Sequence, residues 1–231
     1  MITHGTGPKP VVRVALVAVP LTNPSDQPPT GTPDARERLL AAAYELFSQR
    51  GVHAVGIDMI IQRSGVARQT MYRHFDSKQE LVIAFLERRD QLWTRDWLQA
   101  TVERGGGEPA ARLLAIFDTF DLWFHEPDFE GCSFINVMLE HPDPDHPVHR
   151  ACAAHLATIR RFVADLARRA RIDDPDGLAR DWHILMKGSI VAAAEGDLDA
   201  AKRARRIGEG LLAECGVKSA RAALTRRSAT R

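Results

Sequence analysis

Six side chains between residues 68 and 74 could bind a nucleic acid, because each can donate hydrogen bonds: Arg68, Gln69, Thr70, Tyr72, Arg73 and His74. In the major groove of DNA, a guanidinium pairs with guanine O6 and N7, and a side-chain amide pairs with adenine N6 and N7. Arg68 and Gln69 are therefore the candidates for reading bases. The other four are expected to touch phosphates, which fix register without reading sequence.

Lys78 is a second candidate for a phosphate contact. It follows Ser77 in the first turn of an expected helix, where a cation opposes the helix dipole. A phosphate would remove this conflict, because the free amides of a helix N-terminus and the ammonium would converge on one anion. We expect Lys78 to bind the DNA backbone.

The elements that position these side chains are short helices. Residues 57–64 predict one helix, Gly65 supplies a tight turn, and residues 67–74 predict a second helix whose Met71 and Phe75 face inward. Before them, Thr32 and Pro33 predict a helix start, and Gly51 predicts its end.

A long helix follows, because Ser77 and Glu80 have the spacing of a capping box and apolar residues recur to about Arg104. Further helices are expected at residues 109–125, 131–140, 147–171, 175–194 and 198–214. No segment shows sustained strand alternation. The sequence therefore predicts an all-α fold.

The stretch 57–81, IDMIIQRSGVARQTMYRHFDSKQEL, resembles the helix-turn-helix of the TetR family of transcriptional regulators. The matching positions are Gly65, Val66, Thr70, Tyr72, Phe75, Ser77, Lys78 and Leu81. The first helix is similar too, in LLAAAYELFSQRG at 39–51, so the resemblance covers roughly residues 33–93. Ala67, Ile61 and Gln69 depart from the family pattern, so the angle between the two short helices is expected to differ from the average.

Composition predicts the two terminal segments, and the resemblance implies the two domains between them. The four regions are a flexible N-terminal arm at 1–32, a helix-turn-helix DNA-binding domain at 33–93 with its motif at about 56–75, a ligand-binding and dimerisation domain at 94–216, and a basic tail at 217–231. The C-terminal domain is expected to be a helical bundle.

By the same resemblance, the helices after residue 78 surround a small-molecule pocket. The candidate lining is mostly apolar: Trp93, Trp97, Phe117, Phe120, Phe124, Phe134, Asn136, Met138, His155, Ile159, Phe162 and Met186. Such a pocket favours an apolar or aromatic effector, with Asn136 or His155 as a polar anchor. The alternative is that most of these side chains only form core.

The last two predicted helices carry apolar and small residues that the resemblance assigns to a two-fold dimer interface. The candidates are Trp182, Leu185, Gly188, Ser189, Ala192, Ile207 and Leu211. The alternative is packing inside one protomer alone.

The formal net charge of +1 across 231 residues means that any DNA surface is local. Cys132, Cys152 and Cys215 are too few and too widely spaced for a disulfide framework, so a reducing cytoplasm is expected. The longest apolar run, at 14–21, is too short to cross a membrane, although a processed leader within the first 33 residues is an alternative.

No nucleophile has a recognisable catalytic partner, so an enzyme is not expected, and no cofactor is implied. His141, Asp143, Asp145, His146 and His149 could be drawn as a metal site, but Pro142, Pro144 and Pro147 favour a solvated connection.

The resemblance implies a homodimer that binds a near-palindromic double-stranded operator and is released from it by a small-molecule effector, and no membrane partner is expected. Repression is the expected outcome, and activation stays open. Two other functions remain: a DNA-binding architectural protein without an effector, and a ligand-binding helical protein without DNA binding.

Overall fold

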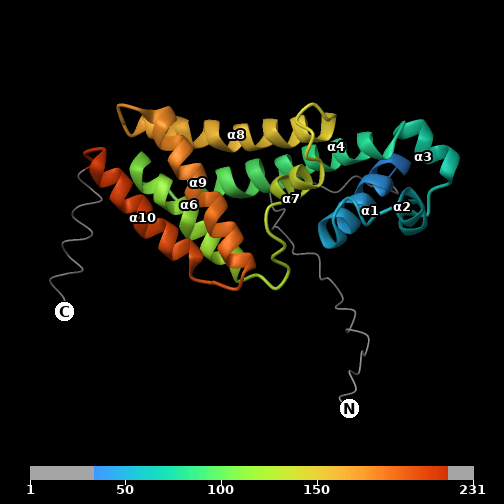
Figure 1. Ribbon diagram of the computed structural model, residues 1–231, viewed down its shortest axis with the longest axis horizontal. Coiled ribbons are helices and arrows are strands. Elements are labelled where there is room, and N and C mark those ends of the chain that lie inside the picture. Colours follow the sequence, from blue (N-terminus) through green and yellow to red (C-terminus); the bar gives the residue numbers. More distant parts are fainter. Residues whose placement is uncertain (1–33, 218–231) are drawn as a thin grey trace, which may run out of the picture. The chain divides into compact units, whose positions relative to one another are not determined.

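The computed structural model describes residues 34–217, and within this range helix is the only regular secondary structure. The all-α prediction is confirmed. The helices are α1 (Ala35–Arg50), α2 (Ile57–Ser64), α3 (Arg68–His74), α4 (Lys78–Arg89), η1 (Asp90–Gln99), α5 (Ala100–Arg104), α6 (Pro109–Phe124), α7 (Ser133–Glu140), α8 (Pro147–Arg169), α9 (Pro175–Ala194) and α10 (Ala200–Glu214) (Figure 1).

The first helix starts slightly later than predicted. Asp34 caps α1, since its carboxylate accepts a hydrogen bond from the Glu37 amide at 2.7 Å. Thr32 and Pro33, the predicted start, lie outside the described residues, as does the expected arm. Of the predicted tail, only Val217 is described, and it packs partly against the core.

The turn between α2 and α3 follows the prediction. Gly65 has φ of 65°, in the left-handed region that favours glycine, and its N–H donates to Ile61 O. Met71 and Phe75 are buried, so one side of α3 is fixed against the protein. The helix begins at Arg68 instead of Ala67, because Ala67 has an extended backbone and occupies the N-cap position, where it makes no side-chain hydrogen bond.

The predicted long helix runs through α4, η1 and α5 without a break. Ser77 Oγ accepts from the Glu80 amide at 3.2 Å, while the Glu80 carboxylate accepts from the Asp76 amide at 2.6 Å instead of from Ser77. The middle segment, η1, is a π-helix, a rare form that is frequent at functional sites. The sequence did not predict it.

This long helix connects the N-terminal helices to the helices of the C-terminal region. Phe85 of α4 packs edge-on against Tyr44 and Phe47 of α1, with ring centroids 5.4 and 5.5 Å away. Farther along, α8 lies against α4, as Figure 1 shows. The described residues, 34–217, consequently belong to one compact unit, and the expected domain boundary at residue 93 falls inside a continuous helix.

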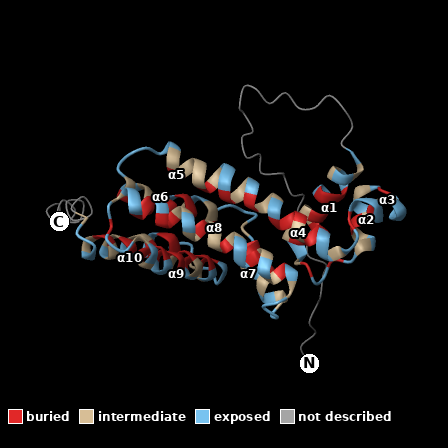
Figure 2. Ribbon diagram, turned by 90° about the horizontal axis from the view of Figure 1, so that it is seen from above, coloured by how far each residue is buried: buried red, intermediate tan, exposed pale blue. Residues whose placement is uncertain are grey.

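The core of the C-terminal region lies between α6, α8, α9 and α10, where buried residues face one another (Figure 2). Trp182 is fully buried, with its ring 5.3 Å from that of Phe117. A Cβ on Gly208 would approach the Trp182 ring to 2.7 Å, so this crossing of α9 and α10 requires glycine. No helix among the described residues is long and apolar enough to cross a membrane.

Candidate nucleic-acid interface and effector region

The outer side of α3 carries the predicted DNA-binding side chains. Five of them are exposed and Thr70 is half-buried; the exposed ones are Arg68, Gln69, Tyr72, Arg73 and His74. Tyr72 keeps 44% of its surface exposed although it is a large aromatic residue. The helix therefore presents hydrogen-bond donors outward while Met71 anchors its inner side, which is the arrangement that groove reading needs.

Arg68 is held by a neighbour on α2. Its guanidinium forms an ion pair with the Asp58 carboxylate, and both side chains are exposed. The pair aims Arg68 across the turn between the two helices. One carboxylate leaves part of the five-donor guanidinium free to bind a base.

Lys78 is half-buried, and the protein itself supplies a partner for it. Its Nζ donates to Val52 O, in the turn between α1 and α2, at 2.6 Å. Burial lowers the pKa of Lys78, and the nearby Glu140 carboxylate opposes that effect. In the free protein, Lys78 ties the start of α4 to this turn.

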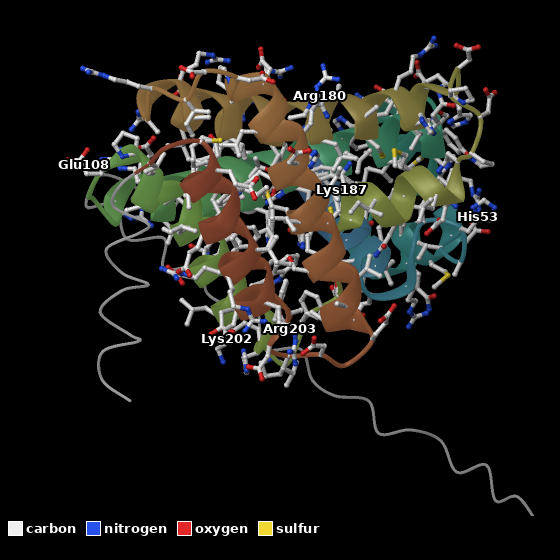
Figure 3. All side chains as sticks on the ribbon, turned by 60° about the vertical axis from the view of Figure 1, so that its left-hand side comes forward. His53, Glu108, Arg180, Lys187, Lys202 and Arg203 are labelled. Carbon is white, nitrogen blue, oxygen red and sulfur yellow. The ribbon has the colours of Figure 1, made fainter. Side chains whose placement is uncertain are left out.

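Glu140, at the end of α7, holds the same turn. Its carboxylate accepts from the His53 backbone N–H at 2.6 Å, and a Cβ on Gly51 would come within 2.8 Å of the Glu140 Oε1. Sequence reasoning missed this contact, because the partners are 87 residues apart. The contact connects the helix-turn-helix to α7, and His53 lies at the surface (Figure 3).

A cavity of about 290 Å³ lies beside this contact. It is lined by Val52, His53, Lys78, Gln79, Val82, His141, His146 and Val148. The lining comes from the α1–α2 turn, the start of α4 and the loop that leads into α8. Sequence reasoning did not predict a cavity at this junction.

The histidines of the 141–149 loop make local hydrogen bonds. His149 Nδ1 donates to His141 O at 2.8 Å, His141 Nδ1 donates to Val137 O at 2.9 Å, and His146 Nδ1 accepts from the Val148 amide at 3.3 Å. Among the described residues, no three His, Cys, Asp or Glu side chains are grouped so that they could hold a metal ion. The structure thus gives these rings a role in shaping the loop.

Several predicted pocket residues meet in an aromatic cluster. The Trp93 ring centroid lies 4.8 Å from that of Trp123, 5.2 Å from that of Trp97 and 6.0 Å from that of Phe120. Phe124 joins through Phe120 at 5.6 Å. Trp123 belongs to the cluster but was not predicted, because its position on α6 does not distinguish it from a surface residue.

The remaining predicted pocket residues are divided between the core and its edge. Phe117, Phe134, Ile159 and Met186 are buried, while Met138, His155 and Phe162 are half-buried. None of them lines the junction cavity. Asn136 must be corrected as an interior anchor: it is exposed, and its Nδ2 donates to Glu130 O at 3.4 Å.

His183, which was not predicted, is buried on α9 with its Nδ1 unpaired. Burial, and after it the nearby cations Lys187 and Arg160, lower the pKa of His183 to about 4. Lys187 lies one turn along α9 (Figure 3). His183 is therefore a neutral core residue at ordinary pH.

The predicted dimer residues lie on α9 and α10 and differ in exposure. Trp182 and Ser189 are buried inside the protomer, so neither can contact a partner. Leu185, Ala192 and Leu211 are half-buried, while Gly188 and Ile207 are exposed. The exposed residues of α9 and α10 include five that we call the outer face below: Ile184, Gly188, Val191, Ile207 and Gly210.

This outer face is open at its two glycines. A Cβ added at Gly188 or Gly210 would meet nothing within 4 Å. Ile184 is 67% exposed and Val191 50% exposed, which is unusual for apolar side chains spaced along one side of a helix. Lys202 and Arg203, at the start of α10, are held by Asp199 and Asp197 (Figure 3).

Comparison with known proteins divides the chain into two matched regions. Residues 39–85 match the model described as bacterial regulatory proteins, tetR family, and residues 109–207 match the tetracyclin repressor-like C-terminal domain. The chain is similar in structure to SCO4454, a TetR-family transcriptional regulator from Streptomyces coelicolor. The sequence identity is 32%, the TM-score is 0.73, and 80% of this chain and 91% of that chain are covered.

Two curated relatives match mainly over part of the chain. The chain is 49% identical over 105 residues to the HTH-type transcriptional activator FasR of Mycolicibacterium smegmatis, which covers 44% of this chain and 45% of FasR. It is 28% identical over 108 residues to the HTH-type transcriptional repressor NemR of Escherichia coli, which covers 46% of this chain and 54% of NemR.

Proposed function

This chain belongs to the TetR family of bacterial transcriptional regulators, and we propose that it works as a homodimer that reads a near-palindromic operator and leaves it when an effector binds. Residues 33–93 would form the DNA-binding domain and residues 94–216 the effector-binding and dimerisation domain. The proposal rests above all on α3, where exposed donors stand opposite the buried Met71.

In this proposal, two copies of α3 enter successive major grooves about 34 Å apart. Arg68 and Gln69 read bases, whereas Thr70, Tyr72, Arg73 and His74 hold phosphates. Lys78 reaches a phosphate with the N–H groups of its ammonium that Val52 O leaves free. A change in the separation of the two copies of α3 would release the DNA.

The continuous helix from Lys78 to Arg104 supports a mechanical link between effector and DNA. It carries Lys78 at one end and the Trp93 and Trp97 rings farther along. Effector binding lowers DNA affinity only if the effector prefers the non-binding arrangement, and a tenfold loss requires about 1.4 kcal/mol of such preference. The aromatic cluster favours an apolar or aromatic effector body.

We propose repression as the regulatory outcome. The E. coli relative NemR is named a repressor and the relative FasR an activator, so the family accommodates both. A reporter gene placed downstream of the operator distinguishes repression from activation. Higher reporter expression after deletion of the protein supports repression, and lower expression supports activation.

Salt dependence of duplex binding tests DNA binding itself. With a labelled random duplex, fluorescence anisotropy should show at least about a tenfold loss of affinity between 50 and 200 mM salt, because each neutralised phosphate contributes about −0.9 to the log–log slope. Folded protein that binds no duplex at either salt concentration would contradict the proposal.

Glu140 offers a test of the coupling between the two domains. In Glu140→Ala, the His53 amide loses its acceptor, and we expect hydrogen exchange of the 52–55 amides to be roughly five- to tenfold faster, equal to about 1 to 1.4 kcal/mol. Glu140→Gln keeps an acceptor oxygen and should stay near the wild type. Unchanged exchange in the alanine variant would show that the contact does not hold the turn.

A further inference from the structure

Three buried polar atoms on η1 have no hydrogen-bond partner in the described part of the chain: Asp90 Oδ1, Trp93 Nε1 and Thr94 Oγ1. Asp90 and Thr94 are 4% and 0% exposed. An unpaired buried polar group costs about as much as a lost hydrogen bond, so native proteins keep few of them. Three within five residues, in the one segment with π-helical geometry, call for an explanation.

Asp90 lies at the contact between η1 and α8. Asp90 and Thr94 are four residues apart and share a side of the helix. His155 of α8 approaches from the opposite side, its Nδ1 3.6 Å from Asp90 Oδ1, too far for a hydrogen bond. The Phe134 ring of α7 stacks on His155 with the ring centroids 5.1 Å apart.

Charge at this position is already balanced. The Arg95 Nε donates to Asp90 Oδ2 at 2.9 Å, which leaves only Oδ1 without a partner. Burial lowers the pKa of His155, and the Asp90 charge opposes this only in part, so the imidazole is neutral at pH 7. A ligand bound here must form hydrogen bonds with the unpaired protein atoms. The site itself has no net charge for the ligand to neutralise.

We propose that Asp90, Trp93 and Thr94 bind the hydroxyl group of an effector whose flat apolar ring packs in the aromatic cluster. The hydroxyl donates to Asp90 Oδ1 and accepts from Trp93 Nε1 or Thr94 Oγ1. A carboxylate cannot donate and is repelled by Asp90, and an ammonium cannot accept. This assignment rests on the proposed function, since it specifies the chemistry of the effector site.

The ring of the effector would lie beside Trp93, which contacts Trp97, Trp123 and Phe120. Ring-against-ring packing provides affinity with little directional selectivity. The hydroxyl contacts would provide the selectivity, because a site with unpaired polar atoms rejects a ligand that leaves them unpaired.

Four probes with one ring system test the ligand class by calorimetry: 2-naphthol, 2-methylnaphthalene, 2-naphthoate and 2-naphthylmethylamine. The proposal predicts that 2-naphthol binds at least about tenfold more tightly than each of the others, the ratio that corresponds to about 1.4 kcal/mol. Equal or tighter binding of any other probe, or no binding of 2-naphthol, would overturn it.

Thr94→Val tests the same site without a ligand. The substitution keeps the shape and removes the unpaired hydroxyl, so it should raise the melting temperature by about 2 °C and reduce the preference for 2-naphthol. Thr101→Val is the matched control, because the Thr101 Oγ1 accepts from Arg104; it should not raise the melting temperature. A lower melting temperature for Thr94→Val would show that a buried water already pairs this hydroxyl, and would overturn the proposal.

Asp90→Asn retains the shape of the side chain and weakens the acceptor, so it too should reduce the 2-naphthol preference. Asp96→Asn, an exposed acid on the same segment, should leave it unchanged. The calorimetry and melting measurements are made without DNA. Loss of DNA binding by the wild type would therefore refute the regulator function and leave the ligand result intact, and the reverse is equally visible.

Discussion

Arg68→Ala is expected to weaken operator binding by at least about 30-fold at fixed salt. A bidentate contact between arginine and guanine contributes about 1–3 kcal/mol of discrimination. Each dimer places two copies of Arg68 on its operator, so about 2–6 kcal/mol is lost, and every 1.4 kcal/mol is a factor of ten. The loss should be largest for the best operator and small for random DNA, because Arg68 is proposed to read a base.

Arg63→Ala is a suitable control for this experiment. Arg63 lies on α2 and is held by both carboxylate oxygens of Glu45 at 2.8 and 2.9 Å, so it should contribute little to base reading. Anisotropy with operator and random duplexes measures both variants. Equal losses on the two duplexes in Arg68→Ala would reassign Arg68 to phosphate binding, and no loss on either would remove it from the interface.

Separation of the dimer into monomers should reduce operator binding even more than Arg68→Ala does. The double variant Ile184→Arg with Val191→Arg places four cations in one symmetric contact on the outer face. We expect monomers at micromolar concentration and operator binding reduced by at least about 100-fold, because a monomer grips one half-site and loses the second α3. Analytical ultracentrifugation measures the first effect and anisotropy the second.

Leu139→Arg tests whether any exposed apolar residue would behave in this way. Leu139 lies on α7 and is 71% exposed, outside the outer face. It should leave the dimer intact. A double variant that remains dimeric, with the circular dichroism spectrum of the wild type, would exclude the outer face as the interface.

Trp182 shows why the sequence could not distinguish the buried side of α9 from its exposed side. Along α9, apolar residues occur on the inner and outer sides, so periodicity alone cannot say which side meets a partner. In the structure, Trp182 packs against Phe117 and above Gly208 inside the protomer. Ile184, only two residues later, faces outward. The distinction depends on α6 and α10, which are distant in the sequence.

Local signals explain what could be predicted. Residues 57–64 form α2 with the expected bounds because Gly65 ends that helix in a left-handed conformation. Ser77 caps the start of α4 as expected, by accepting from the Glu80 amide. These features depend on neighbours within four residues, and local chemistry decides them.

Local sequence signals did not predict features that depend on contacts in the folded chain. The Glu140 contact joins positions 87 residues apart, so no local pattern indicates it. The π-helical geometry of η1 has no known sequence signature among these residues. Such features carry much of the proposed coupling, since they connect the DNA-binding turn and the aromatic cluster to the rest of the chain.

The central claim is that a dimer of this chain reads a DNA sequence through α3. Selection of bound sequences from a random duplex pool tests it most directly, with the wild type and the Arg68→Ala and Tyr72→Ala variants compared at two salt concentrations. The account predicts enrichment of a near-palindrome with half-sites about one helical turn apart, which weakens or disappears in the variants. Folded wild-type protein that enriches no sequence at either salt concentration would contradict it.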